Sequence, residues 1–425
     1  MTRPTVKLSD LFAQKSSSLN PALYPDEVFE LYSVPAFDRG VPDVVSGHEI
    51  GSAKQTVSPG QVLLSKIVPH IRRAWIVGRQ TNRRIIASSE WIVLNSERAD
   101  PRYLSYVLIS DDFHRHFMAT VGGVGGSLLR AQRDQVAQIE LSLPDLSDQR
   151  RVADALDALR RSIELHSLAI TCARALKSMT MRQLFTRGLR GEPQKATEIG
   201  PVPRSWKVQR LGAIGRVGNG STPKKSNGEY WQGGSYPWLT SARVYDREIT
   251  CAKEFVTRIA LQKCHLPQLA PSTVLVAITG QGRTLGHCAV LQIEASISQH
   301  LAYIAVEETI ASATFVRDYL ETQYDFFRQV ASGGGSTKGA LTCAFLRDVR
   351  LPLPTLAEQR EITELLAAIE GKIYFHKRKK ALLEELFKAL LNGLMTGAIS
   401  VSDLDLTALE DSPASVIPEA VAAAV

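Results

Sequence analysis

Basic side chains crowd one short stretch of the chain, Lys66 to Arg84, which contains no acidic residue. A histidine and an aromatic residue, His70 and Trp75, lie within it. Cations beside an aromatic ring suit a surface that contacts the backbone phosphates of nucleic acid. The same pattern is equally typical of a solvated hairpin face. The candidate DNA contacts here are Lys66, His70, Arg72, Arg73, Arg79 and Arg83.

The second half of the chain offers polar, basic and aromatic side chains on predicted loops at 219–225 (NGSTPKK) and 238–247 (WLTSARVYDR). A third segment, 280–286, lacks the GxGxxG spacing of a nucleotide loop and predicts a turn with side chains free to face DNA. Glycine-rich segments at 121–128 and 332–339 permit close approach of backbone to phosphate, or equally a flexible hinge. The candidates in this half are Asn219, Ser221, Thr222, Lys224, Lys225, Arg243, Tyr245, Arg247, Gln281, Arg283, Thr284 and Lys338.

Motifs that would indicate an enzyme are weak. The string at 100–103 (DPRY) lacks the second proline of an amino-methyltransferase motif and begins a predicted helix. Glu370-Gly371-Lys372 has the Glu-x-Lys form of a nuclease, but it lies within a long helix, where we expect solvated surface without a second carboxylate. Cys264-His265 and His287-Cys288 offer zinc-type ligands, although adjacent ligands are poor geometry for one tetrahedral ion. We therefore predict no catalytic residue and no metal site.

The elements that must position these residues occur twice. LPDLSDQRRVADALDALRRSIELH (143–166) returns as LPTLAEQREITELLAAIEGKIYFH (353–376), at an offset of 210 without a gap. Ser88 and Ser298 share that offset. A period this long is too large for a solenoid and indicates two half-proteins, each a globular segment followed by a helix.

Each repeated segment predicts a helix of roughly 40 residues, about 60 Å at 1.5 Å per residue. Thr355 and Glu358 fit a capping box at the start of the second copy. Apolar residues then recur in steps of three and four, which is typical of a coiled coil; Lys177 and Lys380 interrupt this seam, as polar residues do when they fix register. Copies of one unit pair most simply about a pseudo-twofold axis, hence antiparallel. The apolar side chains left over imply a further partner, and they are Leu165, Leu168, Leu176, Phe375, Leu382 and Leu386.

Short runs of β-forming residues dominate both globular segments, separated by Gly and Pro. The predicted strands are Val62–Leu64, Ala74–Val77, Arg84–Ala87, Trp91–Leu94, Thr273–Ile278, Ala289–Ile293 and Leu301–Val306, and the predicted helices of the first segment are Pro101–Ile109 and Asp112–Thr120.

Composition sets broad bounds. The chain has 425 residues, 44% of them apolar, and a formal net charge of +7. This length predicts two or three domains, and the basic balance modestly favours an anionic partner such as nucleic acid. No apolar run is long enough to cross a membrane, no signal peptide is evident, and the five cysteines form no CxxC pair. We expect a cytoplasmic protein that binds no membrane.

The LPxLxEQRxI pattern at the end of two globular halves resembles the specificity subunit of type I restriction-modification systems. The segments EIGPVPRSWKVQRLGAIGRVGNG (198–220) and SPGQVLLSKIVPHIRRAW (58–75) are similar to the family's recognition domains. This resemblance covers roughly residues 5 to 400. It implies an α+β fold: two pseudo-symmetric α/β target-recognition domains separated by two long antiparallel coiled-coil helices. The expected boundaries are recognition domains at 1–145 and 204–352, helical spacers at 146–190 and 353–400, a linker at 191–203 and a disordered tail at 401–425.

By the same resemblance, the chain would be non-catalytic and would bind a bipartite, asymmetric site on double-stranded DNA. Helix length would set the unread spacer of that site. Two modification (methyltransferase) subunits would pack on the helices, and two ATP-dependent restriction subunits would join them to cut DNA. S-adenosylmethionine, ATP and Mg²⁺ would belong to those partners. The alternatives are a coiled-coil scaffold without DNA readout and a DNA-modifying enzyme with its own active site.

Overall fold

The structure is a computed structural model that describes residues 4–13, 17–122, 129–280, 283–333 and 340–400. Its contacts divide the chain into two compact units, one formed by Met1–Ser167 with Arg378–Val425 and the other by Leu168–Lys377. Each unit therefore contains one globular segment and parts of two long helices, α5 (Leu146–Arg187) and α11 (Leu356–Thr396). The glycine-rich segments predicted at 121–128 and 332–339 lie largely outside the described residues.

The second unit is built on a five-stranded sheet in the order β16-β23-β20-β21-β18, antiparallel except for the β18–β21 pair. Every residue of β20, with the sequence TVLVA, is buried, as expected for a central strand. The strands are β16 (Gly215–Asn219), β18 (Glu248–Ile249), β20 (Thr273–Ala277), β21 (Cys288–Leu291) and β23 (Leu301–Val306). The predictions for β20, β21 and β23 are confirmed to within two residues.

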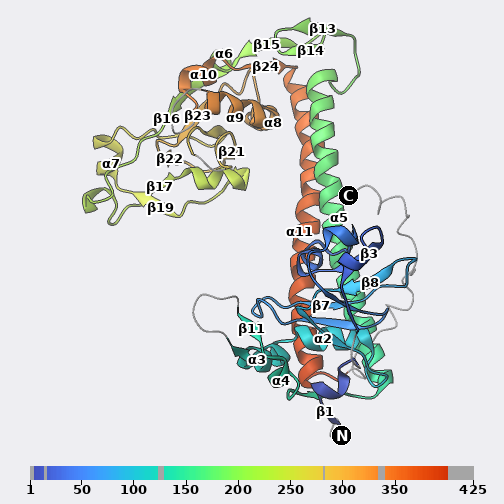
Figure 1. Cartoon of the computed structure of the whole chain (residues 1–425). Helices are drawn as coiled ribbons and strands as arrows, with labels where there is room; N and C mark the ends of the chain where they lie inside the picture. The colour runs from blue at the N-terminus through green and yellow to red at the C-terminus, as the bar shows by residue number, and fades with distance from the viewer. Residues whose placement is uncertain (1–3, 14–16, 123–128, 281–282, 334–339, 401–425) are drawn as a thin grey trace. The chain divides into compact units, whose positions relative to one another are not determined.

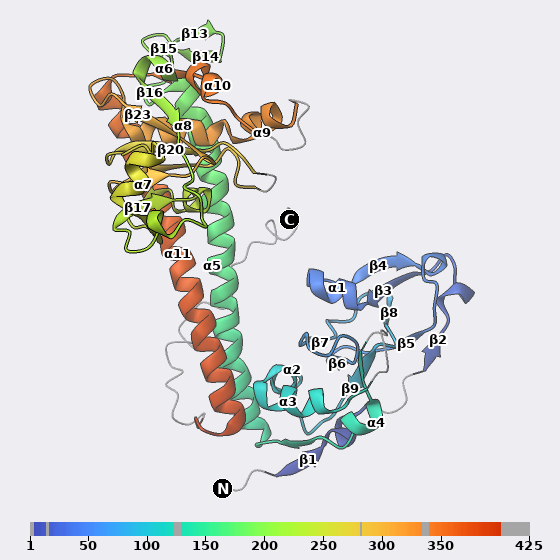
Figure 2. The same cartoon turned by 90° about the vertical axis from the view of Figure 1, so that its left-hand side faces the viewer.

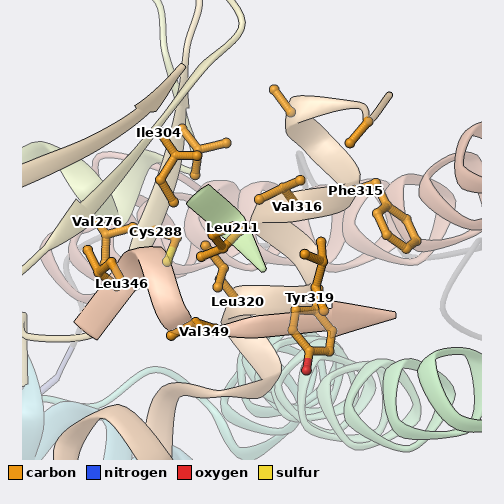
Figure 3. Packing of buried hydrophobic residues seen from close by; sticks show 14 of the residues in the cluster. Leu211, Val276, Cys288, Ile304, Phe315, Val316, Tyr319, Leu320, Leu346 and Val349 are labelled. Carbon is orange, nitrogen blue, oxygen red and sulfur yellow. The ribbon is translucent and has the colours of Figure 1, made fainter. Parts of the chain in front are cut away.

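Helix α8 (Ala313–Thr322) packs on β20 and β21 of this sheet (Figure 1). Phe315, Val316 and Leu320 project from it and are fully buried. Figure 3 shows them beside Val276 and Ile304, which point from the sheet. Burial of such a side chain contributes about 1.5–3 kcal/mol, so this interface forms the main core of the unit.

Smaller elements complete the second unit. Helices α9 (Tyr324–Gly333) and α10 (Cys343–Asp348) follow α8, and the unit also contains a three-stranded sheet, β19-β17-β22. A hairpin, β13–β14, occupies the segment predicted as a plain linker. The remaining elements are β13 (Gln194–Thr197), β14 (Gly200–Pro203), β15 (Lys207–Arg210), α6 (Leu211–Ile214), η4 (Gly228–Tyr230), β17 (Tyr236–Leu239), η5 (Ser241–Asp246), β19 (Glu254–Val256), α7 (Arg258–Lys263), β22 (Ser296–Ile297) and β24 (Arg350–Leu353), which pairs with β15.

The first unit repeats this plan with a three-stranded sheet, β7-β6-β9, and a five-stranded sheet, β2-β5-β8-β3-β4. Figure 2 shows helices α2 and α3 beside the smaller sheet. The helix predicted at Pro101–Ile109 is confirmed as α2, and α3 begins one residue earlier than predicted. The elements are β1 (Thr5–Lys7), η1 (Leu8–Leu11), β2 (Ser18–Leu19), η2 (Pro21–Leu23), β3 (Val28–Tyr32), α1 (Val34–Arg39), β4 (Asp43–Ser46), η3 (Gly47–Glu49), β5 (Lys54–Thr56), β6 (Val62–Ser65), β7 (Ala74–Ile76), β8 (Arg84–Ala87), β9 (Trp91–Leu94), α2 (Pro101–Ile109), α3 (Asp111–Ala119), β10 (Val121–Gly122), β11 (Arg130–Ala131), α4 (Arg133–Val136) and β12 (Glu140–Ser142).

The sequence repeat extends into the hydrogen bonds of both cores. Ser88 and Ser298 form the same turn, in which the hydroxyl accepts a hydrogen bond from the amide two residues later, Glu90 in the first unit and His300 in the second. Each turn joins a strand of one sheet to a strand of the other, β8 to β9 in the first unit and β22 to β23 in the second. The two halves thus share a framework as well as a helix.

Gln149 ties the start of α5 to the globular part of the first unit. Its side-chain nitrogen donates to the carbonyl oxygens of Arg98 (3.0 Å) and Pro144 (2.9 Å). Its oxygen accepts from the amide of Asp100 at 2.8 Å, and Asp100 is the N-cap of α2. The side chain therefore satisfies three backbone groups at the junction of two helices.

Gln359 makes the same three bonds in the second unit. Its nitrogen donates to the carbonyl oxygens of Ile310 (3.2 Å) and Pro354 (3.0 Å), and its oxygen accepts from the amide of Ser312 (2.8 Å), the N-cap of α8. The recurrence of Gln149 as Gln359 in the sequence thus reflects one junction built twice.

The long helices run antiparallel within each unit. In the first unit, Leu156 near the start of α5 and Leu394 near the end of α11 share one core. In the second, Leu184 near the end of α5 and Leu366 near the start of α11 share another. The capping box predicted for α11 is half right: the amide of Glu358 donates to the Thr355 hydroxyl, but the Glu358 carboxylate accepts from the Trp206 indole at 3.1 Å.

Candidate nucleic-acid interface

The end of β16 and the loop that follows it carry five predicted contacts, which are Asn219, Ser221, Thr222, Lys224 and Lys225. Gly220 at the base of this loop lies so close to Ile297 that a Cβ would meet the Ile297 carbonyl oxygen at 2.0 Å. Only glycine therefore allows the loop to leave the sheet at this point. Asn219 and Lys224 are exposed, Ser221 is half-buried, and the buried hydroxyl oxygen of Thr222 has no hydrogen-bond partner among the described residues.

Lys225 is held in an aromatic cage. Its ammonium lies 3.7 Å from the ring centroid of Trp231 and 5.0 Å from that of Trp238, and it pairs with Glu254. These contacts hold the loop in place and leave the ammonium of Lys225 already paired. The neighbouring Lys224 has no ion pair or side-chain hydrogen bond with any described residue, so it is the cation that this loop offers to a ligand.

The segment around η5 also contains one predicted contact that is bonded within the unit and one that is exposed. Arg243 donates to the carbonyl of Cys251 at 3.0 Å and pairs with Asp246 at 2.8 Å, and its side chain is mostly buried. Tyr245 is exposed, with its hydroxyl 3.0 Å from that of Thr284. Tyr245 is therefore available to a ligand, whereas Arg243 supports the segment.

Arg247 joins the globular part of the second unit to the long helix α11. It pairs with Glu321 at 2.6 Å, Asp318 at 2.9 Å and Glu370 at 3.4 Å. Its backbone has φ +56° and ψ −44°, a strained conformation for a residue other than glycine. These three ion pairs engage the guanidinium, so it is not free to contact DNA as the sequence analysis expected.

Lys177 of α5 completes this ionic network. Its ammonium lies 2.9 Å from a carboxylate oxygen of Glu321 and 2.9 Å from one of Glu370. The expectation of a solvated Glu370 without a second carboxylate nearby is wrong, because two helices and a loop converge on it. These ion pairs also explain why a lysine stands at position 177 in the otherwise apolar seam.

The network shifts the pKa values of its members. Burial alone would lower the pKa of Arg247, but the charges of Glu321 and the other carboxylates outweigh it and raise that pKa. Burial would raise the pKa of Glu370, yet the hydrogen bond from Lys177 and the charge of Arg247 hold it below its ordinary value. Both groups are thus kept charged at neutral pH.

The 280–286 turn contributes Arg283 and Thr284. Arg283 is exposed and, among the described residues, its guanidinium has no partner, while its carbonyl accepts from the Tyr324 hydroxyl at 2.8 Å. Two further predicted contacts, Gln281 and Lys338, lie outside the described residues.

In the first unit, the basic stretch is split between supporting and available side chains. Arg73 is 7% exposed and makes a two-pronged bond to Asp38 at 2.8 and 2.9 Å. Arg72 donates to the carbonyl of Ile109 and pairs with Asp111 at 2.6 Å. The side chains with no ion pair or side-chain hydrogen bond in the described part of the chain are Lys66, His70, Arg79 and Arg83.

Both long helices expose apolar side chains, as predicted. The six predicted partner contacts, Leu165, Leu168, Leu176, Phe375, Leu382 and Leu386, are 37–58% exposed. Met179 and Tyr374 are exposed too, and the sequence analysis missed them. The signal for Met179 was available, since it lies three residues after Leu176 and so on the same face of the helix.

Two classes of site receive no support from the described residues. No group of three or more His, Cys, Asp or Glu side chains there is placed to hold a metal ion. None of the helices in this part of the chain has the length and apolar composition to cross a membrane. His287, one of the residues considered and rejected as zinc ligands, lies between the rings of Tyr245 and Tyr324, at centroid distances of 5.0 and 4.5 Å.

Comparison with known proteins agrees with this architecture. The family model of the type I restriction modification DNA specificity domain matches residues 203–385. The specificity subunit of the type I restriction enzyme MjaIX from Methanocaldococcus jannaschii is 29% identical over 216 residues, 48% of either chain. Residues 203–385 therefore resemble the DNA specificity domain of type I restriction-modification systems. The match to the MjaIX subunit spans about half the length of this curated relative.

Two solved structures extend the structural likeness over nearly the whole chain. The S subunit of the type I system of M. genitalium covers 92% of this chain and 96% of its own, with a TM-score of 0.57 and 14% identity. A chain from a study of type I complex assembly and conformational transition covers 93% and 98%, with a TM-score of 0.59 and 21% identity. At these identities the likeness establishes the fold, and it confirms the predicted α+β class with two long helices.

Proposed function

We propose that this chain is the specificity subunit of a type I restriction-modification system. It would recognise a split, asymmetric site on double-stranded DNA, with one globular domain reading each half-site. The observation that carries this proposal is one framework built twice with different loops. Ser88 and Ser298, and Gln149 and Gln359, hold equivalent junctions, whereas Lys224 and Arg283 stand on loops without a matching sequence in the first half. A common scaffold with divergent loops suits two readers of different sequence.

The available side chains define the proposed contact set. In the second domain it comprises exposed and half-buried residues of three loops, and in the first it comprises the free part of the basic stretch. Arginine suits guanine and asparagine suits adenine in the major groove, at about 1–3 kcal/mol for a good bidentate contact. The proposed contacts are Asn219, Ser221, Lys224, Tyr245, Arg283 and Thr284, with Lys66, His70, Arg79 and Arg83.

A second group is proposed to support these loops without reading bases. Arg72, Arg73, Lys225, Arg243 and Arg247 each bond to a carboxylate of the same unit. Buried or caged cations of this kind hold a surface in shape, and truncation would weaken binding through the loop.

Catalysis is proposed to reside in partner subunits, because specificity subunits are non-catalytic by themselves. Two modification subunits would cover the exposed apolar faces of α5 and α11, and two ATP-dependent restriction subunits would join them. S-adenosylmethionine, ATP and Mg²⁺ would be bound by those partners. We place the complex in the cytoplasm, where its DNA is found.

The test is co-expression with the neighbouring modification subunit in a bacterial host that lacks DNA methylation, followed by mapping of N6-methyladenine. The proposal predicts methylation at one split, asymmetric motif only when this chain is present. Methylation without the chain, or none from a demonstrably assembled complex, would contradict it.

A further inference from the structure

A cavity of about 580 Å³ lies within the second unit, between the globular domain and the helices α5 and α11. Its volume is within the range of small-molecule and ligand-group sites. Residues of both helices, of η5, of the turn at 284–288 and of the α8–α9 junction line it. Of the candidate DNA contacts, Tyr245 and Arg247 line this cavity. Its other lining residues were not among those candidates.

The floor of this cavity is electrically balanced. Lys177 and Arg247 contribute two positive charges, and Glu321 and Glu370 contribute two negative charges, all bonded to one another. A ligand gains little from these groups, because each is already satisfied. His287, on the wall, adds no charge at neutral pH, since burial lowers its pKa.

The rim differs from the floor. Arg174 and Arg182 of α5 and Lys377 of α11, which we call the basic rim, are exposed. Neither arginine forms an ion pair or a side-chain hydrogen bond in the described part of the chain. The charge of Lys377 contributes to lowering the pKa of Glu370. Asp325 also lines the cavity, and its carboxylate has no ion pair with any described residue, so three cations face one carboxylate. This imbalance favours an anionic ligand.

The spacing of the basic rim narrows the ligand further. Arg174 and Arg182 are eight residues apart, and Ser178 lies midway, so all three project from one face of the helix. At 1.5 Å per residue the two arginines are about 12 Å apart along the axis. One strand of DNA advances about 3.4 Å along the duplex axis per phosphate, so this distance corresponds to between about three and four phosphate steps. The spacing therefore suits a ligand that carries several phosphates.

We propose that the cavity and its basic rim form a phosphate-binding site that holds the backbone of DNA beside the bases read by the second domain. Arginine and lysine bind phosphate through charge-assisted hydrogen bonds that carry no sequence information. The helices then contribute to DNA affinity directly, in addition to spacing the domains. This inference rests on the proposed DNA recognition, and free polyphosphate is the other source of the same chemistry.

The experiment compares Arg174→Ala/Arg182→Ala and Lys377→Ala with the wild type in the complex with its modification subunit. Fluorescence anisotropy of a labelled duplex between 50 and 200 mM KCl gives the slope of log K against log salt. Each lost phosphate contact should reduce that slope by about 0.9. We expect a reduction of about 1.8 for the double variant and about 0.9 for Lys377→Ala, equal for specific and non-specific duplexes, and no reduction for Arg174→Lys/Arg182→Lys. Arg187→Ala and Lys372→Ala, exposed cations of the same helices outside the cavity, are the matched controls.

A second arm titrates the isolated full chain with sodium tripolyphosphate by calorimetry. Tripolyphosphate binding lost in the double variant, with an unchanged DNA slope, would assign the phosphate site to a free ligand and overturn the DNA assignment. An unchanged slope with no tripolyphosphate binding would overturn the site altogether. If the wild-type complex binds no specific duplex, the proposed function fails instead, and the calorimetric arm still decides whether the site binds phosphate.

Discussion

Replacement of Lys177 by methionine tests the ionic network that joins the second domain to the long helices. The side chain is 9% exposed and bonds to Glu321 and Glu370, both at 2.9 Å. Methionine keeps the length of the stem but removes the ammonium, which leaves two carboxylates to share Arg247. Loss of one partner from a fully buried pair costs about 3–5 kcal/mol. Since both carboxylates are about one third exposed, water recovers part of that loss, and we expect about 2–3 kcal/mol.

Urea unfolding of the chain labelled with 5-fluorotryptophan separates the two units. Trp206, Trp231 and Trp238 report on the second unit by ¹⁹F NMR, and Trp75 and Trp91 report on the first. The variant should shift the second-unit transition to lower urea and leave the first in place. Lys372→Met, which removes an exposed cation of α11, is the control. A shift no larger than that of the control would refute the reasoning.

The same variant should show a defined dependence on pH. Because the folded-state pKa of Glu370 lies below its ordinary value of 4.5, the carboxylate contributes stability that is present above about that pH and lost as pH falls through the folded value. Without Lys177 the pKa of Glu370 rises. The difference in unfolding free energy between wild type and Lys177→Met should therefore narrow between pH 6 and pH 3. A difference that stays constant over this interval would exclude the charge of Lys177 as its cause.

Three further changes follow from single contacts. Gln359→Ala removes the side-chain partners of three backbone groups and should lower the unfolding free energy of the second unit by about 2–4 kcal/mol. Gln359→Glu should lower it nearly as much, because the carboxylate has lost both hydrogen-bond donors of the amide. Gly220→Ala should lower the melting temperature, since its Cβ meets a carbonyl oxygen. Gly371→Ala, in a helix with open space around it, should instead stabilise the fold by up to about 1 kcal/mol. Equal melting temperatures of the two variants would contradict this reasoning. Leu176→Glu should leave unfolding unchanged but abolish co-purification with the modification subunit, and retained assembly would argue against that interface.

The sequence predicted those parts of the fold that depend on local pattern. Alternating and continuous apolar runs located β20 and α2 to within one residue, and the 210-residue repeat predicted the two long helices. It also singled out Gln149 and Gln359 by recurrence. Their role was beyond reach, because the backbone groups they satisfy come partly from the loops before α2 and α8, about 50 residues away in the chain.

The candidate site was predicted less well, for a physical reason. A sequence displays charges but not their partners, and the partners here are distant: Asp38 lies 35 residues from Arg73, and Glu321 lies 144 residues from Lys177. Every basic residue of a loop therefore looked equally free. The structure separates them, so Lys224 is available while its neighbour Lys225 is caged.

The central claim is that each globular domain reads one half-site. The most direct measurement replaces residues 204–352 by the second recognition domain of another type I specificity subunit and maps N6-methyladenine in the methylation-free host. The account predicts a new motif in which one half-site changes to that of the donor and the other is retained. Changes in both half-sites, or in neither, from an assembled and active complex would contradict it.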